Sequence, residues 1–191
     1  PTWSWTSGGG GNGTFRYKLD DSDLSAGATE TTSSSFTPAS NLSEGSHTLY
    51  VQEKDDTDNW SSSGSHIVNI DTTPPNSPSV TGDSLTSDQT PTWSWTSGGG
   101  GGNATFRYKL DDSDLSSGAT ETTGLTFTPA TNLSDGSHFL YVQERDDAGN
   151  WSTSGTFEVE IDITPPETLT VASPTEGQIV SENSINFSGD C

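Results

Sequence analysis

The sequence predicts an all-β chain built from tandem sandwich domains of about 90 residues each. Three observations predict this class. Hydrophobic and polar residues alternate with period two over short segments, and no helical period of useful length is present. The chain also repeats itself. Finally, six Trp, seven Phe and four Tyr stand at patterned positions and can fill thin β-cores, although only 26% of the residues are hydrophobic.

Three segments of the first part of the chain return in the second part at a nearly constant distance. They are 1–7, repeated at 91–97; 14–25, repeated at 105–116; and 70–75, repeated at 161–166. A period of about 90 residues corresponds to one small sandwich domain rather than to a solenoid turn. We therefore predict a repeat over 1–72 that lacks its first strand, a complete repeat over 73–163, and the start of a third, divergent repeat over 164–191. The sequence is expected to be a portion of a longer multidomain chain or filament.

The complete repeat contains seven short segments with strand character, separated by turn signals. They cover residues 79–81, 92–96, 105–110, 119–122, 125–128, 138–145 and 157–161. Alternation places one set of side chains inward, namely Trp93, Trp95, Phe106, Tyr108, Leu110, Leu140, Val142, Phe157, Val159 and Ile161. Seven such strands predict an immunoglobulin-like β-sandwich.

The basic residues lie on the outer face of the predicted strands. In the second copy they are Arg107, Lys109 and Arg145. We expect them to meet Glu158 and Glu160 across strands, in exposed pairs that contribute roughly 0.2–1 kcal/mol each.

The net charge of -21, from six basic and 27 acidic residues, excludes several classes of partner. Nucleic acid and anionic membrane surfaces both require basic surfaces. No apolar run is long enough to cross a membrane. Cys191 is the only cysteine, so no disulfide forms within this sequence. Such an acidic balance suits divalent cations or a soluble, self-repelling surface.

Catalytic patterns are absent from the sequence. No Ser/His/Asp or Cys/His set recurs in both copies, and His47 and His138 are expected to be structural. The glycine-rich stretches 8–11 and 98–102 are followed by neither Lys-Ser/Thr nor a helix, so we predict flexible loops rather than phosphate cradles. We predict that the protein is not an enzyme.

Acidic loops are the strongest candidates for a site. In a sandwich, Asp20, Asp21, Asp23 and Glu44 should gather with Asp71 at one end of the first repeat. Asp146, Asp147 and Asn150 should lie at the facing end of the second repeat. The short, stiff linker 71–75 brings these ends together. Converging carboxylates favour calcium, which accepts six to eight oxygens in flexible geometry. The predicted ligands are Asp20, Asp21, Asp23, Asp55, Asp56, Asp58, Asp71, Asp146, Asp147, Asn150 and Asp162. The alternative is that these are ordinary turn residues on a solvated surface.

Three motifs occur in order in each copy. In the second copy they are a Leu-Ser-Asp-Gly-Ser-His turn at 133–138, an Asp-Asp-Ala-Gly-Asn loop at 146–150 and a Pro-Pro linker at 162–166. With these motifs the chain resembles bacterial Ig-like repeats, which are similar to fibronectin type III modules and recur in large secreted adhesins. The first copy departs from the pattern with Thr57-Asp58 in place of Ala-Gly. The resemblance implies an extracellular structural role, often with calcium at domain junctions. The partners would be neighbouring repeats, and any glycan ligand would bind elsewhere in the protein.

Three functions remain open from the sequence. The leading one is a stalk of extender modules in a bacterial surface protein, stiffened by calcium. The second is an extracellular filament, in which the segment 168–172 of one chain completes the first repeat of the next by strand addition. The third is a carbohydrate-binding module, which would need exposed, coplanar tryptophans.

Overall fold

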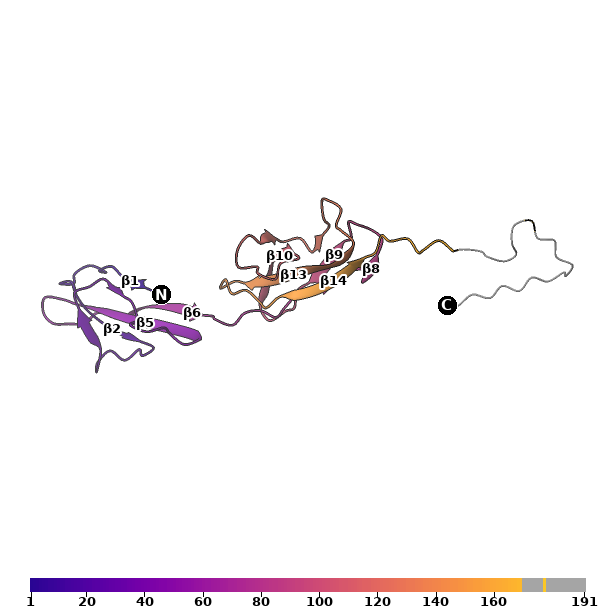
Figure 1. The fold of residues 1–191 in the computed structure, drawn as a ribbon. Helices are drawn as coiled ribbons and strands as arrows, with labels where there is room; N and C mark the ends of the chain where they lie inside the picture. The colour runs from indigo at the N-terminus through magenta and orange to yellow at the C-terminus, as the bar shows by residue number, and fades with distance from the viewer. Residues whose placement is uncertain (170–176, 178–191) are drawn as a thin grey trace.

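The computed structural model describes residues 1–169 and Gly177, and shows two β-sandwich repeats that follow one another along an extended chain (Figure 1). The all-β, immunoglobulin-like class predicted from the sequence is confirmed. The third repeat predicted over 164–191 lies mostly outside the described residues.

The first repeat contains a two-stranded and a four-stranded sheet. The small sheet pairs β1 (Trp3–Ser4) with β4 (Ser35–Phe36). The larger sheet has the order β3 (Thr29–Thr31), β2 (Thr14–Leu19), β5 (Gly45–Lys54) and β6 (Gly64–Ile70), and all its pairs are antiparallel.

The second repeat contains a three-stranded and a five-stranded sheet. The smaller one has the order β12 (Thr126–Phe127), β9 (Trp93–Thr96), β7 (Ser79–Thr81). The larger one has the order β11 (Thr120–Thr122), β10 (Gly102–Leu110), β13 (Gly136–Asp146), β14 (Gly155–Ile161), β8 (Leu85–Thr86). All seven predicted strands are present. The sequence missed β8, which pairs in parallel with the end of β14 and has no alternating pattern of its own.

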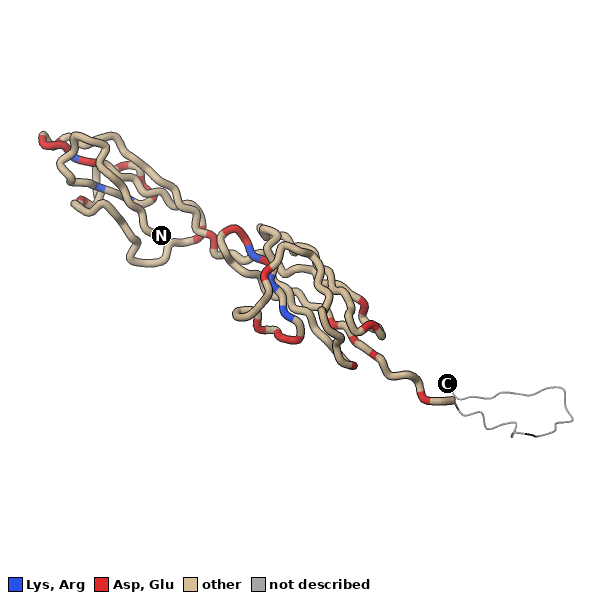
Figure 2. The backbone as a smooth tube through the Cα atoms, turned by 90° about the horizontal axis from the view of Figure 1, so that it is seen from above, with Lys and Arg blue, Asp and Glu red and all other residues tan. Residues whose placement is uncertain are grey.

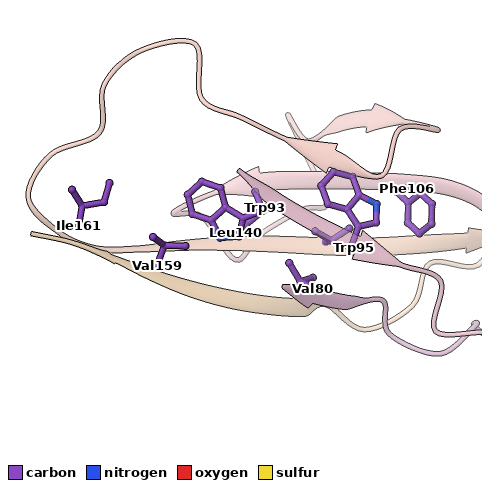
Figure 3. Packing of buried hydrophobic residues seen from close by; sticks show 8 residues of the cluster. Val80, Trp93, Trp95, Phe106, Leu140, Val159 and Ile161 are labelled. Carbon is purple, nitrogen blue, oxygen red and sulfur yellow. The ribbon is translucent and has the colours of Figure 1, made fainter. Parts of the chain in front are cut away.

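The core of the second repeat lies between its two sheets. Trp93, Phe106, Leu140, Val142 and Val159 are each 0% exposed, so the inward register predicted for them is correct (Figure 3). Aromatic rings from both sheets meet edge to face, as Trp95 and Phe106 do at 6.1 Å and 65°. Each fully buried aliphatic side chain stabilises the fold by about 1.5–3 kcal/mol.

The outer face differs from the expectation. Arg107 donates from Nε to Gln143 at 2.8 Å and stacks over Trp151 at 4.3 Å, instead of pairing with Glu158 or Glu160. The reason is the strand order, because β13 lies between β10 and β14 and keeps the bases of β10 two strands away. On β13, Arg145 lies beyond the start of β14, since Gly155 pairs with Val142.

Candidate functional site: the junction between the repeats

The linker between the repeats is anchored to the first repeat by side chains. The carboxylate of Glu44, in the turn before β5, accepts hydrogen bonds from the hydroxyls of Thr72 at 3.0 Å and Thr73 at 2.6 Å. Both hydrogen bonds lower the pKa of Glu44, and the bond from Thr73 has the larger effect. Asp71 accepts a further hydrogen bond from the backbone N–H of Thr73 at 3.0 Å. The first half of the linker therefore has a fixed course.

On the other side of the junction is a preformed loop at the end of β13. Asp146 is 4% exposed and accepts two hydrogen bonds from Asn150, one from the backbone N–H and one from the side-chain amide, both at 2.8 Å. Gly149 closes the turn with φ 97°. Burial acts to raise the pKa of Asp146, but the hydrogen bonds from Asn150 and the loop backbone outweigh it and lower the pKa.

A direct hydrogen bond joins the two repeats. The side-chain amide of Asn150 donates to the carbonyl oxygen of Asp71 at 3.1 Å. Pro75, at the end of the linker, is buried, and its ring restricts the backbone further. Figure 2 shows the acidic residues gathered mainly in loops toward the ends of the repeats, whereas Lys and Arg lie along the strands. The predicted meeting of Asp71 with the loop of Asn150 is therefore present.

The acidic residues after β2 already have partners within the first repeat. Asp20 contacts the ring of His47 at 2.6 Å, and Asp21 pairs with Lys18 at 2.7 Å. Asp23 accepts hydrogen bonds from the turn that follows it. Asp20 thus joins the end of β2 to β5, whereas Asp21 and Asp23 stabilise the turn after β2.

The loop after β5 in the first repeat is the counterpart of the junction loop but lies at the outer end. Asp55 accepts hydrogen bonds from the backbone N–H and the side-chain amide of Asn59. The backbone bond contributes most and the side-chain bond next to lowering the pKa of Asp55 to about 2. Asp58 has φ 67° and pairs with Lys54 at 3.0 Å. Asp56 is exposed.

The remaining predicted ligands are Asp147 and Asp162. Asp147 is exposed in the junction loop, and Asp162 binds the backbone N–H of Thr164 at 2.9 Å at the opposite end of the second repeat. Within residues 1–169 and Gly177, no three His, Cys, Asp or Glu side chains lie close enough together to hold a metal ion. At the junction, hydrogen bonds join Asn150 to both Asp71 and Asp146, and calcium binding stays a prediction.

The two equivalent histidines have the contacts of structural residues. His138 Nδ1 lies 2.7 Å from Asp111, and Nε2 lies 3.1 Å from the carbonyl oxygen of Ser134. Burial acts to lower the pKa of His138, but the hydrogen bond with Asp111 and that with Ser134 raise it overall. Because both ring nitrogens face acceptor oxygens, the protonated ring can donate to both.

Sequence reasoning missed a buried carboxylate. Glu144 is 0% exposed and accepts hydrogen bonds from the hydroxyl of Ser97 at 2.7 Å and the backbone N–H of Ala104 at 3.2 Å. A Cβ on Gly102 would lie 2.3 Å from the Glu144 carboxyl carbon. The glycine-rich stretch 98–102, predicted to be a flexible loop, therefore packs onto this glutamate at Gly102, and Gly98 packs against the backbone of Ser77. The only signal was that the same Ser and Glu recur in the first copy as Ser7 and Glu53.

The tryptophans described below do not offer exposed ring faces on which a sugar could stack. Trp3, Trp93 and Trp95 are 4%, 0% and 2% exposed. Trp60 and Trp151 are half-buried, and each carries a guanidinium over its ring at 4.3 Å. These rings therefore act in packing.

Comparisons with known proteins agree with this architecture. Residues 75–163 match the family model of the bacterial Ig-like domain. This finding confirms, for the second repeat, the resemblance read from the motifs. Among solved structures, the chain is similar to the fibronectin(III)-like modules of Clostridium thermocellum CbhA, with 12% identity, 88% of this chain and 90% of that chain covered, and a TM-score of 0.44. A search of curated proteins found no match.

A membrane-crossing helix is not found anywhere in the described part of the chain.

Proposed function

We propose that the two repeats are structural extender modules of a bacterial extracellular surface protein of the adhesin type. The observation that carries this proposal is the junction, which is fixed from both sides. Glu44 binds the first half of the linker, and Asn150 of the second repeat reaches back to Asp71. A chain of repeats joined in this way keeps its length, which is what a spacer between a cell and a distal binding domain requires.

The surface and the core also support a spacer without catalysis. The charge of -21 makes neighbouring chains repel one another and keeps them soluble. His47, His138, the buried glutamate and most of the tryptophans have structural contacts. The family of Ig-like domains matched by the second repeat is typically non-catalytic, and such domains are often extracellular. The roles of extracellular spacer and of adhesin segment rest on these properties.

Small-angle X-ray scattering of the full chain tests the fixed junction. Asn150→Ala removes the contact with Asp71, and we expect the distribution of distances between the repeats to broaden. Asn59→Ala is the matched control, because Asn59 makes the equivalent bonds to Asp55 at the outer end of the first repeat but none across the junction. Identical scattering from the two variants would contradict the proposal.

We further propose that calcium stiffens the junction. The amide of Asn150 points at both the Asp71 carbonyl oxygen, 3.1 Å away, and a carboxylate oxygen of Asp146, 2.8 Å away. If this amide rotates by 180°, its oxygen joins the Asp71 carbonyl oxygen and the Asp146 carboxylate oxygen, and these three oxygens form a set that a cation would stabilise. Exposed Asp147 is the nearest further acidic residue in the sequence, and water would supply the remaining ligands.

Titration calorimetry with calcium tests this second proposal. We expect binding heat from the full chain, and its loss in Asp146→Ala. The equivalent change Asp55→Ala lies away from the junction and should leave the heat intact. Absence of heat from the unmodified chain would remove calcium from the mechanism, without affecting the spacer role tested by scattering.

The structure gives no support to sugar binding through the tryptophan pairs, because the rings on β1 and β9 face the core.

A further inference from the structure

The chain enters the second repeat through residues 76–78, which follow the linker and precede β7, and we call these residues the entry segment. The backbone N–H of Asn76 donates to the carbonyl oxygen of Gly99 at 3.1 Å. The side-chain amide of the same asparagine donates to the carbonyl oxygen of Gly98 at 3.2 Å. The entry segment is therefore held by the glycine-rich stretch 98–102.

The two segments lie backbone against backbone. A Cβ on Gly98 would lie 2.1 Å from the carbonyl oxygen of Ser77, and one on Gly100 would lie 3.0 Å from the backbone nitrogen of Asn76. Gly99 and Gly100 also have φ values of 76° and 70°, in the left-handed region that glycine adopts readily. No side chain separates the two backbones at these points, so the position of the glycine-rich stretch sets the position of the entry segment.

A stretch of glycines has little conformational preference of its own, and here the buried Glu144 restrains it. The hydroxyl of Ser97 donates to one carboxylate oxygen of Glu144 at 2.7 Å and accepts from the backbone N–H of Gly99 at 3.0 Å. The other carboxylate oxygen accepts from the backbone N–H of Ala104 at 3.2 Å. Since Ser97 precedes the stretch and Ala104 follows it, one carboxylate binds both of its ends.

Glu144 is itself fixed within β13. Its side chain is 0% exposed and follows Val142 on the inward face of the strand. The backbone N–H of Glu144 donates to the hydroxyl of Ser152 at 3.0 Å, and the backbone N–H of Ser152 donates back to the carbonyl oxygen of Glu144 at 2.8 Å. The carboxylate therefore projects from a rigid part of the second repeat.

These contacts leave a single residue between the two fixed halves of the linker. On one side, the hydroxyl of Thr73 is bound to Glu44 of the first repeat. On the other side, Pro75 is buried and Asn76 is bound to the glycine-rich stretch. Pro74 lies between them, and its ring restricts the backbone there. The angle between the repeats thus depends on how firmly each half is held.

We propose that Glu144 is a positioning residue of the junction: through Ser97 it fixes the glycine-rich stretch, and this stretch fixes where the linker enters the second repeat. The inference rests on the proposed spacer function, because it assigns the residue that sets the geometry of that junction. Glu144 acts through Ser97 and Gly99, since its own side-chain hydrogen bonds among the described residues stay within the second repeat.

The first repeat contains the same arrangement at the end away from the junction, and this provides a matched control. The hydroxyl of Ser7 donates to the carboxylate of Glu53 at 2.8 Å and accepts from the backbone N–H of Gly9 at 3.1 Å. Removing this hydroxyl costs a repeat the same two hydrogen bonds as removing that of Ser97. Only the loss at Ser97 affects a stretch that holds the linker.

The test measures the distance between the repeats in the full chain by double electron–electron resonance. Spin labels are attached at Thr29→Cys and Thr120→Cys, two equivalent exposed positions on β3 and β11, with Cys191→Ser to remove the natural thiol. We expect one narrow distance distribution with no further change. Ser97→Ala should broaden it or shift its mean, whereas Ser7→Ala should leave it unchanged. Ser97 is exposed, so its variant should stay folded.

The outcomes separate this inference from the proposed function. A narrow distribution that Ser97→Ala leaves unchanged would overturn the positioning role of Glu144 and leave the fixed junction intact. Equal broadening by Ser97→Ala and Ser7→Ala would also overturn it, because the effect would then reflect a general loss of stability. A broad distribution before either change would overturn both the inference and the fixed junction on which it rests.

Discussion

The two repeats have nearly the same sequence but different degrees of closure. Trp95 is 2% exposed and Val142 is 0% exposed, whereas Trp5 and Val51 are only partly buried. Strand β9 has four residues, but β1 has two, because β7 pairs with the end of β9 and nothing described pairs with the end of β1. The comparison teaches that the first strand of this fold covers the core and extends the strand beside it.

The largest expected difference between the repeats is the loss of stability on replacing Trp95 in the second repeat and its equivalent Trp5 in the first. We expect Trp95→Ala to destabilise the second repeat by about 3–5 kcal/mol, through lost burial and a cavity between the sheets. Trp5→Ala should cost the first repeat clearly less, because solvent already reaches that side of the core. Denaturant unfolding with hydrogen exchange resolves the two repeats. Equal costs would show that the open edge does not weaken the first core.

A smaller difference is expected at the paired glycines. Gly155→Ala should destabilise the second repeat by about 1–3 kcal/mol, since the new methyl group would overlap the Pro78 carbonyl at 1.9 Å. Gly64→Ala should leave the melting temperature of the first repeat unchanged, because nothing lies within 4 Å of the added Cβ. Calorimetry of both variants checks this. A loss of stability in Gly64→Ala would mean that the first repeat is closed in solution by another segment.

The smallest effect concerns pH. Because the folded pKa of His138 is raised above 6.5, its stabilisation is fully present below the unfolded value near 6.5 and is lost as pH rises through the raised folded value. We expect a loss of a few tenths to about 1 kcal/mol, given how exposed Asp111 is. His138→Gln should remove this pH dependence from the second repeat alone. His47→Gln is the matched change in the first repeat, where Asp20 likewise raises the pKa of the histidine. Unchanged pH dependence in both variants would assign it to other groups.

The sequence was sufficient for the features that depend on alternation and repetition. The register of Trp93, Leu140 and Val159 followed from period two, and the facing of Asp71 and Asn150 followed from the short linker. Strand β8 could not be found in this way, because two residues carry no period and their pairing uses backbone groups only.

Features set by long-range packing were also out of reach of the sequence. The burial of Glu144 depends on Ser97 and Ala104 closing over it, which its own neighbours on β13 do not indicate. The partners of Arg107 depended on the strand order, so expected ion pairs became a stack on Trp151. Whether an acidic loop can bind a cation likewise depends on how many hydrogen bonds its carboxylates already accept, and the sequence does not give that number.

The parallel pairing of β8 with β14 has a consequence for tension along the chain. Force would reach the second repeat through the linker before β7 and leave it through the end of β14, at the opposite end of the sandwich (Figure 1). The two strands run in the same direction, so the pull would slide one along the other. The bonds from Glu160 and Asp162 to β8 would then be loaded in shear and share the force, rather than open in sequence as in a zipper. We expect single-molecule pulling to show weaker unfolding peaks for a repeat without its first strand; equal peaks would place the mechanical resistance elsewhere.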